Sequence, residues 1–253
     1  MGSSQGETVA PASSIIMTCT ENVTLYEELL KKTEEYVKVY MAQYNDTSHD
    51  WSHIQRVRKM ALSIAQLEER PVNMQLVELA ALLHDVGDAK FLSSGTDCET
   101  ILRTFMTEAG YPTHLQEGIL WIHQRVSFRY ELEHPDSHIG LYQWELACVQ
   151  DADRLDAIGA IGIARCFSFN AVRNMPLCDP NIPPNVNGNA EQYKKSSAKS
   201  NARNHFYEKL FKIKGMMKTE AGKSEASRRH CLMREFILEF DRECGLDSSL
   251  LPS

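Results

Sequence analysis

The stretch LVELAALLHDVGDAKF, residues 76–91, constrains the fold of this chain more than any other. Seven of its first eight residues are apolar, so a helix here would have no polar face and would be buried on all sides. That helix would end at His84 and Asp85, and such side chains are rarely buried without a partner or a metal. An isolated His-Asp pair is more often a satisfied core pair. Ligand candidates elsewhere in the chain therefore decide between these two interpretations.

Two further residues supply such candidates. His53 lies beside the stripe Ile54, Val57, Ala61 and Ile64, whose spacing predicts a helix over about 51–69. Asp151 follows the apolar run 146–149, so it too is expected near the end of a buried segment. Two imidazoles and two carboxylates suit one divalent ion, with Mn²⁺ favoured and Mg²⁺, Co²⁺, Ni²⁺, Fe²⁺ or Zn²⁺ as alternatives. The sequence therefore predicts a metal site with these ligands: His53, His84, Asp85 and Asp151.

The rest of the chain has helical periodicity and no run of short β-branched strands. Further helices are expected over about 25–42, 97–109, 113–126, 204–218 and 224–244, and residues 142–170 are expected to form a long helical segment, either continuous or broken. Gly159 and Gly162, within the long segment 142–170, are expected where helices pack closely. We predict an all-α fold with one domain over 21–245, a disordered tail over 1–20 and a long loop or lid over 174–200. Residues 201–245 are expected to form the C-terminal helices of the same domain.

Composition excludes several classes of protein. The net charge of −7 argues against a protein that coats nucleic acid, and no apolar run reaches the ~18 residues of a membrane span. Seven cysteines without a C-x-x-C pair favour reduced thiols, and hence a cytoplasmic or nuclear location. The apolar stripe Leu232, Phe236 and Phe240 is expected to pack on its own core or on a second copy, so a homodimer stays open.

Four blocks of sequence carry a resemblance to a known family. They are HDWSHIQRVRKMA (49–61), LLHDVGDAKF (82–91), QDADRLDAIGAIGIAR (150–165) and HFYEKLFKIKGMMKTEAG (205–222). In this order they resemble the HD-domain superfamily of metal-dependent phosphohydrolases, and most closely its branch of YpgQ-like nucleotide pyrophosphohydrolases. The resemblance implies an all-helical fold with the four metal ligands named above. It also implies a catalytic role for Asp88, which stands where related HD nucleotidases carry Glu.

The mechanism that we expect is attack of a metal-activated water on a phosphorus atom of a small phosphate substrate. Cations near the predicted ligands would neutralise phosphate oxygens in the transition state, and the candidates are Arg56, Lys90, Arg154 and Lys209. Asp153 and Asp156 are expected beside the metal and not as ligands. One of the two would orient a ligating histidine by accepting its free ring N–H.

The sequence is compatible with three functions. The first is hydrolysis of a (deoxy)nucleoside triphosphate with release of pyrophosphate. The second is a phosphomonoesterase or cyclic-nucleotide phosphodiesterase that uses the same metal site. The third is a metal- or nucleotide-binding regulator without turnover, which the intact set of ligand types disfavours.

Overall fold

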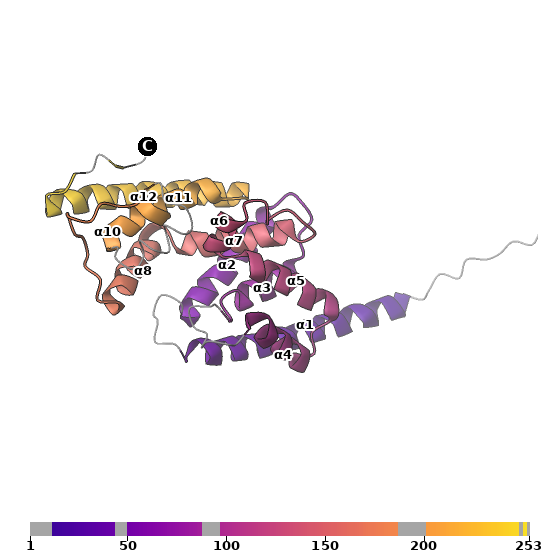
Figure 1. Cartoon of the computed structure of the whole chain (residues 1–253). Helices are drawn as coiled ribbons and strands as arrows, with labels where there is room; N and C mark the ends of the chain where they lie inside the picture. Colours follow the sequence, from indigo (N-terminus) through magenta and orange to yellow (C-terminus); the bar gives the residue numbers. More distant parts are fainter. Residues whose placement is uncertain (1–11, 44–49, 88–96, 187–200, 248–249, 252–253) are drawn as a thin grey trace, which may run out of the picture.

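The computed structural model describes residues 12–43, 50–87, 97–186, 201–247 and 250–251. All regular structure within these ranges is helical, which confirms the all-α prediction (Figure 1). The α-helices are α1 (Ala12–Met41), α2 (Trp51–Leu67), α3 (Met74–Leu83), α4 (Cys98–Ala109), α5 (Thr113–Arg125), α6 (Phe128–Glu133), α7 (Gln143–Asp156), α8 (Gly159–Val172), α10 (Ala202–His205), α11 (Phe211–Ile213) and α12 (Glu220–Cys244). A π-helix, η1 (Phe206–Leu210), and a 3₁₀ turn, η2 (Lys214–Met216), interrupt the run between α10 and α12.

Helix α3 lies at the centre of the core, as its sequence predicts. It contacts α1, α2, α5 and α7, and all of its apolar residues from Leu76 to Leu83 are buried. Asn73 begins the helix by accepting a hydrogen bond from the backbone N–H of Leu76 at 3.1 Å. Because α3 is enclosed by other helices, its C-terminal end delivers His84 and Asp85 into the interior of the protein.

The long segment predicted over 142–170 is two helices. α7 and α8 meet at an angle of 66°, and Gly159 at the break has a positive φ of 76°, which favours glycine. Gly159 also lies where helices pack closely, as expected, since a Cβ there would stand 2.9 Å from Cγ of Arg229 on α12 (Glu220–Cys244). At Gly162 a Cβ would stand 2.2 Å from the carbonyl oxygen of Ala157, so the close contact there is with the backbone of the bend. The bend ends α7 shortly after Asp153, so that the last turn of this helix faces α2.

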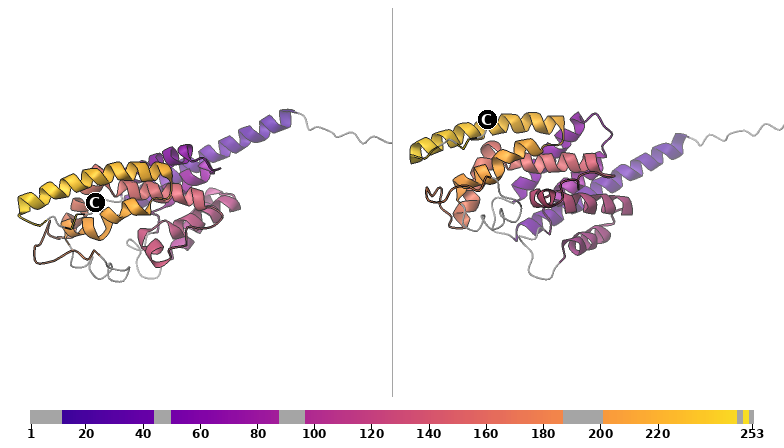
Figure 2. Two further views of the ribbon diagram at one scale, coloured as in Figure 1. Left: turned by 90° about the horizontal axis from the view of Figure 1, so that it is seen from above. Right: turned by 45° about the horizontal axis from the view of Figure 1, so that its top comes forward.

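Two terminal regions differ from expectation. Helix α1 begins at Ala12, within the tail predicted to be disordered, because no glycine or proline interrupts residues 12–41. Figure 2 shows its N-terminal part extending away from the rest of the molecule. Helix α12 packs along α7 and α8 (Figure 2), with Met233 and Ile237 fully buried. Leu232, assigned to the packed stripe, is 39% exposed and lies outside it.

The other boundaries are observed only in part. The segment after α8 is irregular as far as residue 186, and the remainder of the predicted lid lies outside the described residues. In the part of the chain that the structure describes, no single helix is long and apolar enough to cross a membrane. The bent pair of α7 and α8 has the length and composition of a span only when both helices are taken together.

Candidate metal centre

The candidate metal centre lies where α2, the end of α3 and α7 meet. Asp50 caps the N-terminus of α2 by accepting a hydrogen bond from the backbone N–H of His53 at 2.9 Å, which fixes the start of the helix and turns His53 inward. His53 is completely buried, and His84 and Asp85, in the turn after α3, are buried beside it. Asp153 reaches the same point from α7 and is partly exposed.

The turn after α3 is held from both sides. His123, on α5, donates a hydrogen bond to the carbonyl oxygen of Val86 at 2.8 Å. The backbone N–H of Gly87 donates to the hydroxyl of Tyr40 on α1 at 3.0 Å. Gly87 has a φ of 78°, and a Cβ there would stand 2.8 Å from the Cβ of Cys98. These contacts hold the backbone of the two residues that follow Asp85.

Hydrogen bonds set the orientation of both imidazoles. His53 Nδ1 donates to Asp156 Oδ2 at 2.7 Å, and His84 Nδ1 donates to the carbonyl oxygen of Ala81 at 2.8 Å. With the proton on Nδ1, each Nε2 of a neutral imidazole carries a lone pair that can bind a metal. These two Nε2 atoms lie 3.3 Å apart. Two lone pairs at this distance repel each other unless a cation or a proton lies between them.

The carboxylates add negative charge at the same place. Asp85 Oδ2 lies 3.3 Å from His53 Nε2 and 3.5 Å from His84 Nε2. Asp153 Oδ1 lies 3.6 and 3.7 Å from the same two nitrogens. Ligands bound to one ion at about 2.0–2.2 Å stand about 3.0–3.6 Å apart. The donor set and its spacing therefore fit a divalent metal ion, and the pKa of His53 agrees with this requirement for positive charge. Burial alone would lower that pKa, but the hydrogen bonds to Asp156 and Asp85 raise it.

The structure corrects the fourth predicted ligand. Asp151 is completely buried, but its Oδ1 accepts a hydrogen bond from Lys218 N at 2.9 Å, and its Oδ2 accepts from Thr219 N at 2.8 Å and Thr219 Oγ1 at 2.7 Å. Gly222 packs so closely that a Cβ there would stand 2.2 Å from Asp151 Oδ2. Both oxygens of Asp151 thus accept hydrogen bonds from the residues at the start of α12. Asp153, and not Asp151, lies beside the Nε2 atoms of His53 and His84.

Helical geometry explains the correction. Residues two apart on an α-helix point about 200° away from each other, so Asp151 and Asp153 face opposite sides of α7. Residues three apart share a face, which places Asp156 beside Asp153. The predicted role of one of these two residues in orienting a histidine is confirmed for Asp156, which binds His53. A helical wheel of α7 would have grouped Asp153 with Asp156 and separated both from Asp151.

Asp156 also forms ion pairs with two arginines. Arg56 reaches it with two hydrogen bonds, Nε to Oδ1 at 2.6 Å and Nη2 to Oδ2 at 3.0 Å, and Arg165 Nη1 donates to Oδ2 at 2.7 Å. Burial alone would raise the pKa of Asp156, but the bonds from His53 and Arg56 and the charge of Arg165 hold it well below its usual range. The carboxylate therefore stays ionised. Arg165 was not singled out from the sequence, because an arginine in an Ala/Gly-rich helix carries no spacing signal.

The predicted phosphate-binding cations divide into two groups. Arg56 stands next to the centre with 36% of its side chain exposed. Arg154 does not reach solvent: its side chain is 2% exposed, it pairs with Glu131, and its Nη1 donates to the carbonyl oxygen of Met216 at 3.1 Å. Its prediction as a substrate-binding residue is wrong, because its charge is already neutralised inside the core.

The structure says less about the other predicted substrate-binding and catalytic residues. Lys209 lies on η1, and its Nζ stands 5.1 Å from the centre of the Phe128 ring in a cation–π contact. Asp88 and Lys90 lie outside the described residues. Their catalytic and substrate-binding roles stay predictions.

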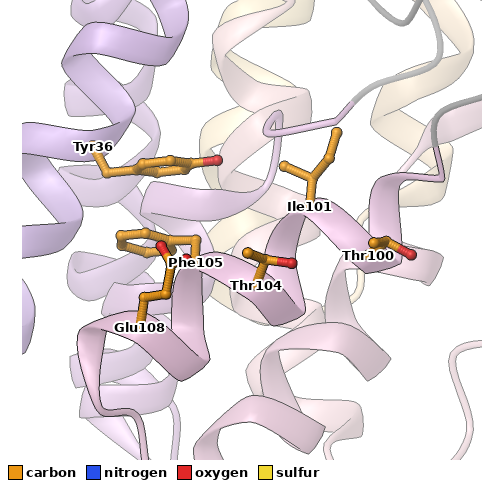
Figure 3. Close-up of a pocket in the computed structure, with 6 residues that line it drawn as sticks. All are labelled: Tyr36, Thr100, Ile101, Thr104, Phe105 and Glu108. Carbon is orange, nitrogen blue, oxygen red and sulfur yellow. The ribbon is translucent and has the colours of Figure 1, made fainter.

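A separate hollow lies between α1 and α4. It has a volume of about 300 Å³, and Figure 3 shows the ring of Tyr36 stacked on Phe105 within it. The ring centres stand 3.9 Å apart. None of the lining residues belongs to the candidate metal centre; they are Tyr36, Thr100, Ile101, Thr104, Phe105 and Glu108.

The chain is similar to known HD-domain proteins in both sequence and structure. Residues 50–158 match the model of the HD domain, a range that contains all four proposed ligands. A solved structure from Lactobacillus plantarum is 32% identical, with a TM-score of 0.74 over 87% of this chain and 98% of that one. An HD-superfamily hydrolase from Bacillus thuringiensis is 34% identical over 88% and 100% of the two chains, with a TM-score of 0.64. YpgQ from Bacillus subtilis, solved in complex with ADP, is 26% identical over 87% and 99%, also with a TM-score of 0.64.

Proposed function

Since this chain belongs to the HD-domain superfamily of hydrolases, we propose that it is a metal-dependent phosphohydrolase acting on a nucleotide. The observation that carries the proposal is that Asp85 and Asp153 each bring a carboxylate oxygen within 3.3–3.7 Å of the Nε2 atoms of His53 and His84. The ADP bound to YpgQ supports a nucleotide as the substrate. Within this class we propose that the substrate is a (deoxy)nucleoside triphosphate and that the inorganic product is pyrophosphate.

The proposed ligands divide the work of holding one divalent cation. His53 and His84 supply neutral nitrogens, each locked in the required tautomer by the acceptor on its Nδ1. Asp85 and Asp153 supply negative charge, which raises affinity for a divalent cation over a monovalent one. Such a cation, with Mn²⁺ favoured, supplies the Lewis acidity that activates water and polarises a phosphoryl oxygen.

Positive charge beside the centre would bind the substrate. Arg56 and Arg165 share the single carboxylate of Asp156, so the three side chains together keep a net positive charge. This surplus favours a polyphosphate, whose charge builds up on its oxygens as the bond to phosphorus breaks. We propose that Arg56 and Arg165 contact the phosphate chain, with Lys90 and Lys209 as further contacts. Asp88 is proposed to orient the attacking water or to protonate the leaving group.

The test is product release from a panel of nucleotides. Metal-stripped protein would be assayed with mono-, di-, tri- and cyclic nucleotides after addition of Mn²⁺, Co²⁺, Ni²⁺, Mg²⁺ or Zn²⁺. Phosphate, pyrophosphate and the nucleoside or nucleotide product would be measured separately, because a cyclic nucleotide yields a nucleoside monophosphate and no inorganic product. Metal-dependent pyrophosphate release from triphosphates is the expected result. Release of phosphate alone would replace the pyrophosphohydrolase with a phosphomonoesterase. Absence of every hydrolysis product with every nucleotide, although metal is bound, would contradict the proposal.

A matched pair of variants makes the test specific to the site. Asp153→Asn removes one proposed ligand and is expected to lose turnover. Asp136→Asn changes the same type of side chain at an exposed position before α7 and is expected to keep it. Equal activity in the two variants would show that the hydrolysis does not come from this centre.

A further inference from the structure

Two cysteines that are far apart in the sequence meet at the C-terminal end of α12. Cys178 lies in the irregular segment after α8, and Cys244 is the last residue of α12. Cys178 Sγ donates a weak hydrogen bond to Cys244 Sγ at a distance of 3.8 Å, across a separation of 66 residues. Cys244 is exposed and Cys178 is partly exposed, so small oxidants reach both sulfurs.

One residue holds both cysteines in place. The backbone N–H of Arg203 donates to the carbonyl oxygen of Leu177 at 3.0 Å, which fixes the residue before Cys178. The guanidinium of Arg203 makes two hydrogen bonds to Asp241, at 2.6 and 2.8 Å, three residues before Cys244. Both side chains of this ion pair are buried, so the pair holds Arg203 and the last turns of α12 in a fixed relative position. Figure 1 shows the segment after α8 running up to this end of α12.

Backbone hydrogen bonds hold both chain segments that carry the cysteines. The carbonyl oxygen of Pro176 accepts a hydrogen bond from Ala202 N at 3.2 Å, next to the bond from Arg203. Gly245, with a φ of 65°, caps the C-terminus of α12 directly after Cys244, and Leu246 N donates to the carbonyl oxygen of Asp241 at 2.8 Å. Two sulfurs kept in contact by such a frame have a high effective concentration with respect to each other.

We propose that Cys178 and Cys244 form a reversible disulfide that staples the segment after α8 to the end of α12 when the protein meets a peroxide. The peroxide first oxidises one thiol to a sulfenic acid, and one water leaves. The second thiol then attacks the sulfenic sulfur: the S–S bond forms, the S–O bond breaks, and a second water leaves. A dithiol reductant reverses the change by thiol–disulfide exchange.

The staple would act on an element of the proposed substrate site. The chain between the two cysteines includes α10 and η1, and Lys209 lies on η1. Closing this loop removes conformations from the unfolded state, which stabilises the folded protein. The cross-link would also limit movement of residues 176–177, which are hydrogen-bonded to the start of α10.

The experiment treats the reduced full-length protein with hydrogen peroxide, blocks the remaining thiols and maps the linked peptides by mass spectrometry. Wild-type protein is expected to lose two titratable thiols and to yield the Cys178–Cys244 peptide with the mass of two hydrogens lost. Cys244→Ser is expected to abolish that peptide. Cys231→Ser is the matched control, because Cys231 is another exposed cysteine on α12, and it is expected to leave the linkage unchanged.

Thermal unfolding supplies a second measurement. The oxidised wild type is expected to melt several degrees above the reduced protein, and the difference should vanish in Cys244→Ser. Linkage of Cys244 to Cys231 or to a second chain would overturn the proposal, as would retention of both thiols while Cys231 is oxidised. A Cys178–Cys244 linkage without a rise in Tm would contradict the proposed stabilising effect of the disulfide. These measurements need neither substrate nor metal, so their outcome is independent of the proposed function.

Discussion

The two faces of α7 show how one side-chain type serves opposite purposes. On the face toward α12, Asp151 is surrounded by hydrogen-bond donors from Lys218 and Thr219, and its charge is satisfied by the protein itself. On the face toward α2 and α3, Asp153 approaches the acceptor nitrogens of His53 and His84. Burial is therefore a poor guide to a metal ligand. The informative property is whether the neighbouring atoms are donors or acceptors, because only a cluster of acceptors requires a cation.

The largest effect is expected for Asp153→Asn. The variant removes one negative ligand from the centre and should lower kcat/KM for the best nucleotide by about 10³-fold, because several kcal/mol of transition-state stabilisation depend on the bound ion. Metal content after dialysis should fall in parallel. Stability of the metal-free protein should change little, since Asp153 is partly exposed. A variant that keeps its metal and its turnover would place the fourth ligand elsewhere.

Asp151→Ala tests the other face of the helix. The change leaves the N–H groups of Lys218 and Thr219 without their acceptor, so we expect a loss of about 2–4 kcal/mol in the free energy of unfolding. Urea unfolding of the metal-free protein measures this loss. Metal affinity at a temperature where the variant is folded should stay near that of the wild type. A variant of full stability that no longer binds metal would reverse the assignment of the two residues.

Asp156→Asn sharpens the comparison by weakening the support of a ligand and not the ligand itself. His53 would lose the carboxylate that accepts its Nδ1–H, and we expect metal affinity to fall about 10–100-fold. Isothermal titration with Mn²⁺ measures this change. Arg56→Lys is a useful companion, because it keeps a charge near Asp156 but loses the two-bond geometry. An unchanged affinity in Asp156→Asn would show that His53 is held by its packing alone.

Acid should release the metal before it unfolds the protein. In the metal-free protein the pKa of His53 is raised above its ordinary value of 6.5. Its proton therefore stabilises the metal-free fold fully below pH 6.5, and this stabilisation is lost as the pH rises through the raised pKa. Metal binding has the opposite dependence, because Nε2 must be unprotonated. We expect apparent Mn²⁺ affinity to fall as the pH drops through that raised pKa; affinity that is flat with pH would contradict it.

The sequence was sufficient for the parts of this protein that depend on periodicity. The apolar run 76–83 identified the central helix α3, and His53, His84 and Asp85 meet at one point as their places in the pattern suggested. The errors concern direction around a helix and the partners of charged groups. Asp151 and Arg154 both lie in the matched block 150–165, yet α12 and Glu131 take up their charges. Those partners are distant in the sequence, so only the fold reveals them.

Asp153 is the residue that we propose completes the metal centre. A crystal structure of the Mn²⁺-loaded protein, with anomalous scattering collected near the manganese edge, tests this proposal directly. We predict one anomalous peak in contact with four atoms: His53 Nε2, His84 Nε2, Asp85 Oδ2 and Asp153 Oδ1. A peak bound to Asp151, or full Mn²⁺ occupancy at a place that none of these four atoms touches, would contradict the account.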